Sequence, residues 1–373
     1  MKRGISIHYG EIALKGKLRS RFEKMLINNI IYGTGYKPAT VENRLFIDNQ
    51  DDSTVNKLTL TPGVSWTGKY IMIERDQDSL EKTLNEIIKD PGQPINLDVK
   101  RIDKNFESTS LDIKQKILKD MHIQLSSTGP KIRVEIMKDS FIVNYDIKRG
   151  IGGVPSGSAG RVISLFSGGI DSAVAPLEMM KRGCNVDLLH VYAVATDAQV
   201  LESKVGEIAR NLSFTAPLKL YMVPFHIFNL KVMSINPRYE LVMFKRFLLK
   251  LADGLCSLYG YKGIVTGDSL SQVASQTLDN ISAISYGIDV PVFRPLLSHN
   301  KEDIIDKAKM YGTYESSIKK YKDCCSIVSK KPLTTASKEK VLEFEKELYL
   351  DAIVKESLSK ISVKKFDSAM IDK

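Results

Sequence analysis

The sequence contains few of the residues that would build a disulfide scaffold or a metal cluster. Its 373 residues include four cysteines, five histidines and one tryptophan. The cysteines are Cys184, Cys256, Cys324 and Cys325, and no two of them have the C-x-x-C spacing of a zinc or redox site. Four cysteines in a chain of this length are too sparse for a disulfide-stabilised fold, so a reducing cytoplasm is the expected compartment.

Long apolar runs are also lacking. No stretch approaches the roughly 20 apolar residues that cross a membrane, and the start of the chain, Met1 to His8, is too polar for a signal peptide. We therefore predict a cytoplasmic protein with no membrane partner. The formal net charge of +10 favours a polyanionic partner such as nucleic acid, but a generally basic proteome would give the same excess.

The pattern of apolar residues divides the chain into two halves. Before residue 150, short expected strands and helices follow one another without a long βα alternation, which is typical of small α+β units. After Arg161, apolar strands expected at 162–166, 186–192, 218–223 and 263–266 alternate with helices. This alternation predicts an α/β domain with a parallel sheet covered on both faces. The glycine-rich segment 150–160 is either a linker between the halves or part of an active-site wall.

The hexapeptide Ser167-Gly168-Gly169-Ile170-Asp171-Ser172 follows an apolar strand and precedes a helix. A helix N-terminus binds anions, because its first N–H groups lack intrahelical partners and the helix dipole adds positive charge. Glycines let the backbone approach a phosphate, and serines add donors. An aspartate would repel phosphate, so it indicates a Mg²⁺ ion carried by pyrophosphate. The hexapeptide is the pyrophosphate-loop (PP-loop) signature of ATP pyrophosphatases, and the alternative is a plain turn that caps a helix.

Several separated segments resemble the tRNA 4-thiouridine synthetase family, whose members are tRNA sulfurtransferases also tied to thiamine biosynthesis. These segments are Tyr9 to Gly16, Lys100 to Phe106, Gly152 to Pro155, the PP-loop, Gly267 to Thr277, Arg294 to Leu296, and Lys301-Glu302. The resemblance covers residues 9 to 335, approximately. It implies an N-terminal ferredoxin-like domain (1–57), a THUMP RNA-binding domain (58–157) and a parallel-sheet PP-loop ATP pyrophosphatase domain (158–373).

The chain departs from the family pattern at three points. Ala173 stands where proline is usual, and Asp268 stands where glutamate is common. The sequence ends at Lys373 without the rhodanese-like domain that carries the persulfide cysteine in longer members. We therefore expect an external sulfur donor, either the persulfide of a cysteine desulfurase or free sulfide. A sulfur carrier protein is a further candidate partner, and a homodimer is expected.

The resemblance implies an ATP-dependent modification of tRNA. The O4 atom of a uridine, at position eight of the tRNA, would attack the α-phosphate of ATP and release pyrophosphate. Sulfur would then displace AMP and give 4-thiouridine, and the same protein would be a candidate sulfur source for thiamine thiazole synthesis. Asp171 is expected to hold Mg²⁺, and the pyrophosphate would be held by Ser167, Gly168, Gly169 and Ser172.

An apolar slot for the adenosine is expected where neighbouring strands end. The expected contacts are Leu165, Phe166, His190, Val191, Lys245, Gly267 and Gln276, with Lys301 near the phosphates. His190 is either a nucleotide contact, which the resemblance favours, or a core histidine. Lys245 and Lys301 are either nucleotide contacts or solvated surface charges.

Sulfur delivery requires a thiol that carries or releases persulfide. Cys324 and Cys325 lie in an expected polar loop whose lysines would lower a thiol pKa. The segment from Cys325 to Pro332 resembles the catalytic-cysteine segment of the family, which favours Cys325 and leaves Cys324 as the second candidate. Adjacent cysteines form a disulfide only with strain, so we expect them to have different partners. Cys184 and Cys256 are expected to be structural.

Contacts with tRNA are expected in the basic N-terminal half, because structured RNA is recognised by shape and phosphate contacts. The candidates are Lys15, Lys17, Arg19, Arg21, Lys100, Arg101 and Lys104. Each of these residues alone is typical of a solvated surface charge, so the prediction of RNA binding rests on their clustering. Two other functions stay open: an ATP pyrophosphatase that acts on a small molecule, and a non-catalytic RNA-binding protein. The basic half and the paired cysteines argue against the first, and the intact PP-loop argues against the second.

Overall fold

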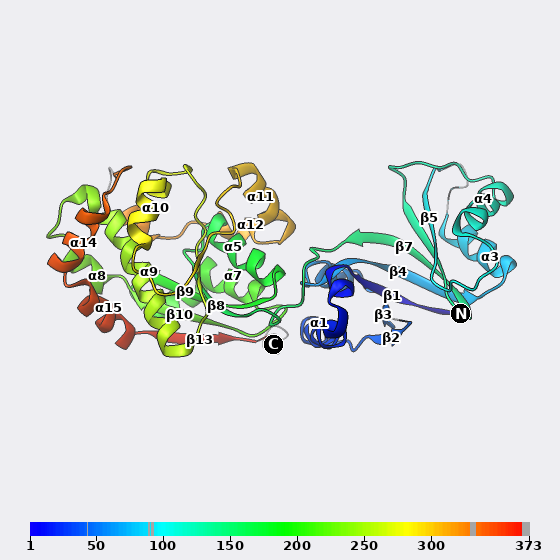
Figure 1. Ribbon diagram of the computed structural model, residues 1–373, viewed down its shortest axis with the longest axis horizontal. Coiled ribbons are helices and arrows are strands. Elements are labelled where there is room, and N and C mark those ends of the chain that lie inside the picture. Colours follow the sequence, from blue (N-terminus) through cyan, green and yellow to red (C-terminus); the bar gives the residue numbers. More distant parts are fainter. Residues whose placement is uncertain (43, 89, 91–92, 329–332, 368–373) are drawn as a thin grey trace. The chain divides into compact units, whose positions relative to one another are not determined.

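The computed structural model describes residues 1–42, 44–88, 90, 93–328 and 333–367 (Figure 1). The chain divides into two compact units, Met1–Val154 and Pro155–Lys373. The predicted boundary at 157/158 differs from this division by three residues. The predicted boundary at 57/58 stays a prediction. Ser329 to Pro332, which end the predicted catalytic-cysteine segment, lie outside the described residues.

The first unit is built on one mixed sheet of seven strands. Their order is β2 (Ala39–Val41), β3 (Arg44–Ile47), β1 (Lys2–Tyr9), β4 (Val64–Glu74), β7 (Ser140–Arg149), β6 (Lys131–Ile136) and β5 (Asn96–Arg101). All neighbours are antiparallel except β5 and β6. Because β1 pairs with β4 from Lys2↔Met72 to Tyr9↔Val64, the small α+β units expected in this half share a continuous sheet.

Helices α1 (Arg19–Thr34), α2 (Asp52–Thr59), α3 (Gln77–Ile87) and α4 (Ser110–Asp120) pack on this sheet. Two short 3₁₀ helices, η1 (Glu11–Leu14) and η2 (Gly16–Leu18), lead from β1 into α1. Side chains alternate along β1: Ile5 and Ile7 join the core beneath α1 and α2, so Ser6 and His8 face the opposite side of the sheet. That opposite face carries a small apolar cluster of Phe46, Tyr70, Met137 and Ile142 and, beside it, polar and basic side chains that are described below.

The second unit contains a six-stranded sheet that confirms the predicted parallel arrangement. The order is β12 (Val292–Phe293), β11 (Ile264–Val265), β8 (Gly160–Leu165), β9 (Cys184–Tyr192), β10 (Leu218–Pro224) and β13 (Ser362–Phe366). The first five strands are parallel, and β13 adds an antiparallel edge. The strand order runs in opposite directions on the two sides of β8, and ligands of open α/β sheets bind at such a switch point.

Helices and short helical turns surround this sheet (Figure 1). They are α5 (Ile170–Lys181), α6 (Asp197–Glu202), α7 (Lys204–Leu212), α8 (His226–Val232), η3 (Pro237–Tyr239), α9 (Glu240–Tyr259), η4 (Ala274–Gln276), α10 (Leu278–Ser285), α11 (Lys301–Met310), α12 (Tyr314–Ser317), α13 (Cys324–Ile327), α14 (Lys338–Glu347) and α15 (Leu350–Ser359). Across the described parts of the chain, none of the helices combines the length and the apolar character that a membrane span requires.

Candidate active site

The PP-loop connects β8, at the centre of the second sheet, to α5. Gly168 has a φ of +81°, a conformation that side-chain-bearing residues rarely adopt, and this explains the first glycine of the motif. Helix α5 begins at Ile170, within the hexapeptide that was expected to precede the helix, with Gly169 as its N-cap. Asp171 and Ser172 therefore lie in the first turn, whose N–H groups have no intrahelical acceptor.

Hydrogen bonds between the two serines close the loop on itself. Ser172 Oγ donates to Gly169 O (2.9 Å) and accepts from the Ser167 N–H (3.2 Å), while the Gly169 N–H donates to Ser167 Oγ (3.3 Å). The two hydroxyls are also 3.1 Å apart. The serine hydroxyls thus hold the shape of the loop, and the main-chain N–H groups of the first turn of α5 are left as anion donors.

Asp171 brings together three segments that are far apart in sequence. Lys301 Nζ, at the start of α11, lies 2.8 Å from Asp171 Oδ1. Gln272 Nε2, from the loop after β11, donates to Asp171 Oδ2 (3.2 Å). Gly267 explains how that loop comes so close, because a Cβ there would lie 2.8 Å from the backbone carbonyl carbon of Asp171. Gly267 therefore lies directly against the PP-loop helix, and its predicted contact with the nucleotide stays a prediction.

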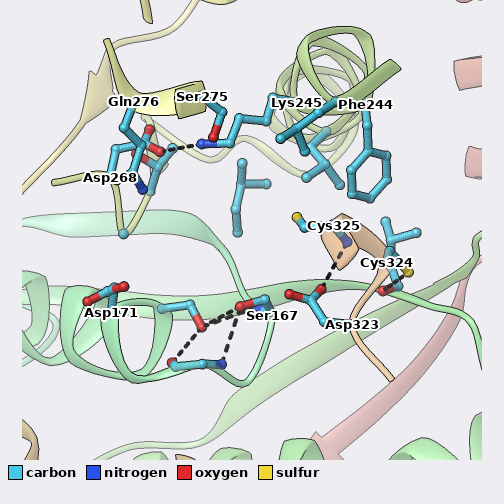
Figure 2. Close-up of a pocket in the computed structure, with 18 of the residues that line it drawn as sticks. Ser167, Asp171, Phe244, Lys245, Asp268, Ser275, Gln276, Asp323, Cys324 and Cys325 are labelled. Carbon is cyan, nitrogen blue, oxygen red and sulfur yellow. Dashed lines mark hydrogen bonds and ion pairs between the residues drawn. The ribbon is translucent and has the colours of Figure 1, made fainter. Parts of the chain in front are cut away.

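A cavity of about 430 Å³ opens beside the PP-loop (Figure 2). This volume lies in the range of small-molecule sites. Most of the predicted residues line it: Leu165, Phe166, Ser167, Gly169, Asp171, Ser172, Val191, Lys245, Gly267, Gln276, Cys324 and Cys325. Gly168, His190 and Lys301 are not among the lining residues. Gln276 lines the cavity, and its buried Oε1 atom is an acceptor with no hydrogen-bond partner within the described residues.

A buried carboxylate holds Lys245 at the cavity wall. Lys245 Nζ, from α9, lies 3.0 Å from Asp268 Oδ1, and Arg294 Nε lies 3.4 Å from Asp268 Oδ2. Burial alone would raise the pKa of Asp268, but Lys245, the Thr266 hydroxyl and Arg294 bring this pKa below its ordinary value. Lys245 is therefore a paired, oriented cation and not a solvated surface charge. Aspartate at position 268 is long enough for this pairing, although glutamate is common there in the family.

His190 lies behind the cavity wall. Its side chain is 2% exposed, with Nδ1 2.7 Å from Phe166 O and Nε2 2.9 Å from the Tyr321 hydroxyl. Burial lowers the pKa of His190 to about 4, so the imidazole is neutral at pH 7. The predicted direct contact of His190 with the nucleotide is corrected accordingly: the ring is a buried link, while its neighbour Val191 lines the cavity.

The cysteine segment differs from the expected polar loop. Cys324 and Cys325 begin the short helix α13, where the Asp323 carboxylate caps the helix by accepting the Cys325 N–H (3.3 Å). Cys324 is buried and donates from Sγ to Val191 O (3.2 Å), whereas the Cys325 sulfur points toward α9 (Figure 2).

The expected lowering of the thiol pKa values is wrong. Burial, followed by Asp323, raises the pKa of Cys325 to about 12, and it raises the pKa of Cys324 still further. Cys184 and Cys256 are buried, and burial raises their pKa values also.

The comparisons with known proteins agree with this architecture. The family model of the thiamine biosynthesis protein (ThiI) matches residues 157–350, and the model of the ThiI ferredoxin-like domain matches residues 4–67. The chain belongs to the ThiI family. A probable tRNA sulfurtransferase of Staphylococcus epidermidis is 31% identical over 97% of this chain and 94% of its own length. A probable tRNA sulfurtransferase of Staphylococcus aureus is 30% identical over 95% of this chain and 92% of its own length.

Solved structures also resemble this member of the ThiI family. The crystal structure of a 4-thiouridine synthetase–RNA complex with bound ATP matches with a TM-score of 0.83 and 28% identity, over 98% of this chain and 100% of that one. PH1313 from Pyrococcus horikoshii matches with a TM-score of 0.62 and 22% identity, over 84% of this chain and 100% of its own, and shares the fold.

The ThiI-type cavity also contains residues that the sequence analysis missed. Helix α9 contributes Leu241, Phe244 and Leu248 beside Lys245, and the loop before α13 contributes Asp323. The spacing 241, 244, 245, 248 is that of one helix face, so Lys245 and this pattern together could have predicted the apolar wall. Gln272 and Tyr321 carried no comparable signal.

The predicted RNA-binding residues fall into two groups in the first unit. Lys15, Lys17, Arg19 and Arg21 follow β1, whereas Lys100, Arg101 and Lys104 lie at the end of β5, four strands away and about 19 Å across the sheet. Arg19 pairs with Glu23 (2.8 Å) and donates to the Tyr9 hydroxyl (2.8 Å). Arg101 donates to Phe106 O (2.8 Å) and Ser108 O (3.3 Å). These two arginines stabilise local structure, while Lys17, Arg21, Lys100 and Lys104 are exposed.

A second basic surface, missed from the sequence, lies on the helix-free face of this sheet. A cavity of about 310 Å³ is lined by Ser65, Trp66, Lys131, Arg133, Ile147 and Arg149, from β4, β6 and β7. His8 stacks on Trp66 with ring centroids 3.5 Å apart, and Arg133 lies over the same ring at 4.9 Å. Burial and then the charges of Arg44, Arg133 and Lys100 hold the pKa of His8 well below its ordinary value. We call the cavity lined by Ser65, Trp66, Lys131, Arg133, Ile147 and Arg149 the Trp66 cavity.

Proposed function

We propose that this protein is an ATP-dependent tRNA sulfurtransferase that converts a uridine, at position eight of tRNA, to 4-thiouridine. The observation that carries the proposal is that the PP-loop and Cys325 line the same cavity. The PP-loop suits activation of an oxygen by ATP, and the thiol suits delivery of sulfur to the activated carbon. The names of the Staphylococcus relatives and of the ATP-bound 4-thiouridine synthetase support this assignment.

In the first half-reaction, the uridine O4 attacks the α-phosphorus of ATP and pyrophosphate leaves. The first-turn N–H groups of α5 would donate hydrogen bonds to the leaving pyrophosphate, and Lys245 and Lys301, now paired with Asp268 and Asp171, would offset its charge. The adenine fits against the apolar wall formed by Leu165, Val191 and Phe244. The predicted nucleotide contacts at Gly267 and Gln276 remain part of this proposal.

The residues at the loop suit a Mg²⁺ ion bound mainly through phosphate. Within the described residues no cluster of three or more His, Cys, Asp or Glu side chains is suited to hold a metal. Asp171 would supply one carboxylate oxygen, and phosphate and water would supply the rest, as is usual for Mg²⁺. When bound, the ion would neutralise charge on the leaving pyrophosphate. Asp171 would have to release Lys301 or Gln272 to contact it.

In the second half-reaction, a sulfur nucleophile attacks C4 and AMP leaves. With free hydrosulfide, this attack and the loss of one proton give 4-thiouridine directly. With a persulfide on Cys325, the terminal sulfur attacks C4 and forms a disulfide between Cys325 and the base. A second thiol then attacks the Cys325 sulfur, 4-thiouridine leaves, and a disulfide with that thiol remains on Cys325. A cysteine desulfurase or free sulfide as donor, a sulfur carrier protein, a homodimer and a role in thiamine synthesis stay part of the proposal.

The test is mass spectrometry of tRNA nucleosides after incubation of the protein with tRNA, ATP, Mg²⁺ and either sulfide or a persulfide donor. We expect 4-thiouridine at position eight, and Asp171→Ala should abolish it while tRNA affinity stays within a few-fold. Turnover near wild type in Asp171→Ala would contradict the proposed site. An ATP pyrophosphatase that acts on a small molecule would instead exchange pyrophosphate into ATP without added tRNA.

A further inference from the structure

The segment that leads to the cysteines is fastened to β9 at two consecutive residues. The Tyr321 hydroxyl lies 2.9 Å from His190 Nε2, and Cys324 Sγ donates to Val191 O at 3.2 Å. The ring of Tyr321 also lies against that of His190, with centroids 5.6 Å apart. Since β9 runs beside β8, which ends at the PP-loop, these contacts place the cysteine segment against the nucleotide-binding strands.

The contacts form a chain of hydrogen bonds from Phe166 O through His190 to the Tyr321 hydroxyl. The Phe166 carbonyl determines which group donates in each bond. The Phe166 carbonyl, 2.7 Å from His190 Nδ1, can only accept, so Nδ1 carries the proton of the neutral ring. Nε2 then presents a lone pair, and the Tyr321 hydroxyl must donate to it. Because His190 is buried, water does not compete for either bond, and such a bond is stronger than one at the surface.

This chain of hydrogen bonds joins the two halves of the site. Phe166 directly precedes Ser167 of the PP-loop, and Tyr321 stands two residues before Asp323, which caps α13. Phe166 is also held by its own N–H, which donates to Leu189 O at 2.8 Å. The PP-loop strand therefore keeps its position without Tyr321, whereas the cysteine segment loses a bond to β9.

We propose that His190 and Tyr321 are positioning residues for sulfur transfer, and that Cys324 is an anchor while Cys325 carries the sulfur. The two tethers on β9 turn the Cys324 sulfur toward Val191 O and leave the Cys325 sulfur in the cavity, beside Lys245. This inference rests on the proposed function. It separates the half-reactions: the bond between Tyr321 and His190 supports sulfur transfer and not adenylation.

The test is Tyr321→Phe, which removes one hydroxyl and keeps the ring. We expect the yield of 4-thiouridine from a persulfide donor to fall about tenfold, the scale of one net hydrogen bond. The tRNA-dependent conversion of ATP to AMP should stay within about twofold. Excess sulfide, which needs no cysteine, should restore the yield to within about twofold. Tyr349→Phe, at an exposed tyrosine, is the matched control and should behave like wild type.

Two further measurements keep the inference falsifiable. Alkylation of Cys324 by iodoacetamide should increase in Tyr321→Phe, because its segment is released from β9. His190→Gln combined with Tyr321→Phe should be no worse than the more severe single variant, since the bond between the two residues is already broken in Tyr321→Phe. Equal losses of adenylation and sulfur transfer, or no loss of either, would overturn the inference. A wild-type protein that forms no AMP with tRNA would overturn the proposed function itself.

Discussion

Burial controls the chemistry of the Cys325 thiol. One of the lysines near it in sequence, Lys319, pairs with Glu207 (2.6 Å) instead. Burial and the neighbouring Asp323 raise the pKa of Cys325 to about 12, and Lys245 offsets only part of this effect. In the free protein the sulfur is therefore a thiol at neutral pH. A persulfide is more acidic than its parent thiol, which favours its anion as the form that attacks.

The first prediction concerns the pH dependence of this thiol. The thiolate is the reactive form, and its fraction grows about tenfold per pH unit below the pKa. The alkylation rate of Cys325 should therefore keep rising from pH 7 to pH 10, whereas an ordinary thiol levels off near its pKa of about 8.5. Peptide mass spectrometry after timed iodoacetamide treatment measures the rate, with a short cysteine peptide as the control. A plateau near pH 8.5 would show that Cys325 is not shielded as described.

At the scale of elements, three loops meet at the carboxyl end of the second sheet. The PP-loop, the loop after β11 and the start of α11 converge on Asp171. Their spacing is set by Gly267, where any Cβ would lie within 2.9 Å of backbone atoms of Asp171 and Ser172. Backbone cannot move aside as a flexible side chain does, so the loop after β11 must shift if this position is filled.

The second prediction follows from that contact. Gly267→Ala should destabilise the protein by about 1–3 kcal/mol, as overpacking does, and should weaken ATP binding because the first turn of α5 is displaced. Thermal unfolding and ATP titration measure the two effects. Gly10→Ala is a suitable control, since a Cβ there meets nothing closer than 3.7 Å. Unchanged stability and unchanged ATP affinity together would contradict the predicted displacement.

Local signals allowed much of this site to be predicted. The strand, the Gly-Gly turn and the helix are contiguous, so the PP-loop and its anion-binding end could be predicted directly. The bond between Lys301 and Asp171 spans 130 residues and was not predicted, although Lys301 was expected near the phosphates. The contact of Gln272 with Asp171 and that of Tyr321 with His190 depend on how distant loops pack, which leaves no periodic trace in the sequence. The continuous first sheet was missed for the same reason, since β1 pairs with the distant β4.

At the scale of the whole molecule, the chemistry and the basic surfaces occupy different units. The residues that line the nucleotide cavity lie between Leu165 and Ser326, and all of them belong to the second unit. The exposed lysines and arginines near β1, and the Trp66 cavity, belong to the first unit. Charge changes in the first unit should therefore alter tRNA affinity while leaving ATP binding intact.

The third prediction distinguishes the basic surfaces. Each phosphate contact contributes roughly 0.7–0.9 to the slope of log affinity against log salt. Replacing Lys17 and Arg21 by glutamine should reduce that slope by up to about 1.8 if both contact phosphates, and so should replacing Lys131 and Arg149. The matched control is the same substitution at Lys355 and Lys360, which are exposed on the second unit.

Binding of labelled tRNA at several salt concentrations measures these slopes. Arg19→Gln should instead lower stability, because Arg19 is held by Glu23 and Tyr9. A pair whose removal leaves the slope unchanged lies outside the RNA footprint. If all three pairs lower the slope equally, the effect is one of net charge and not of a defined surface.

The orientation of the two adjacent sulfurs also determines how the protein responds to oxidants. A disulfide needs its sulfurs about 2.05 Å apart, yet Cys324 is turned toward Val191 O and Cys325 toward the cavity. Both cysteines line the cavity, but Cys324 is buried, so a peroxide that enters meets the Cys325 sulfur first, and the sulfenic acid it forms has no neighbouring thiol directed at it. Recovery then depends on a small thiol from the surroundings, so the thiol concentration of the medium sets how quickly oxidised protein regains activity.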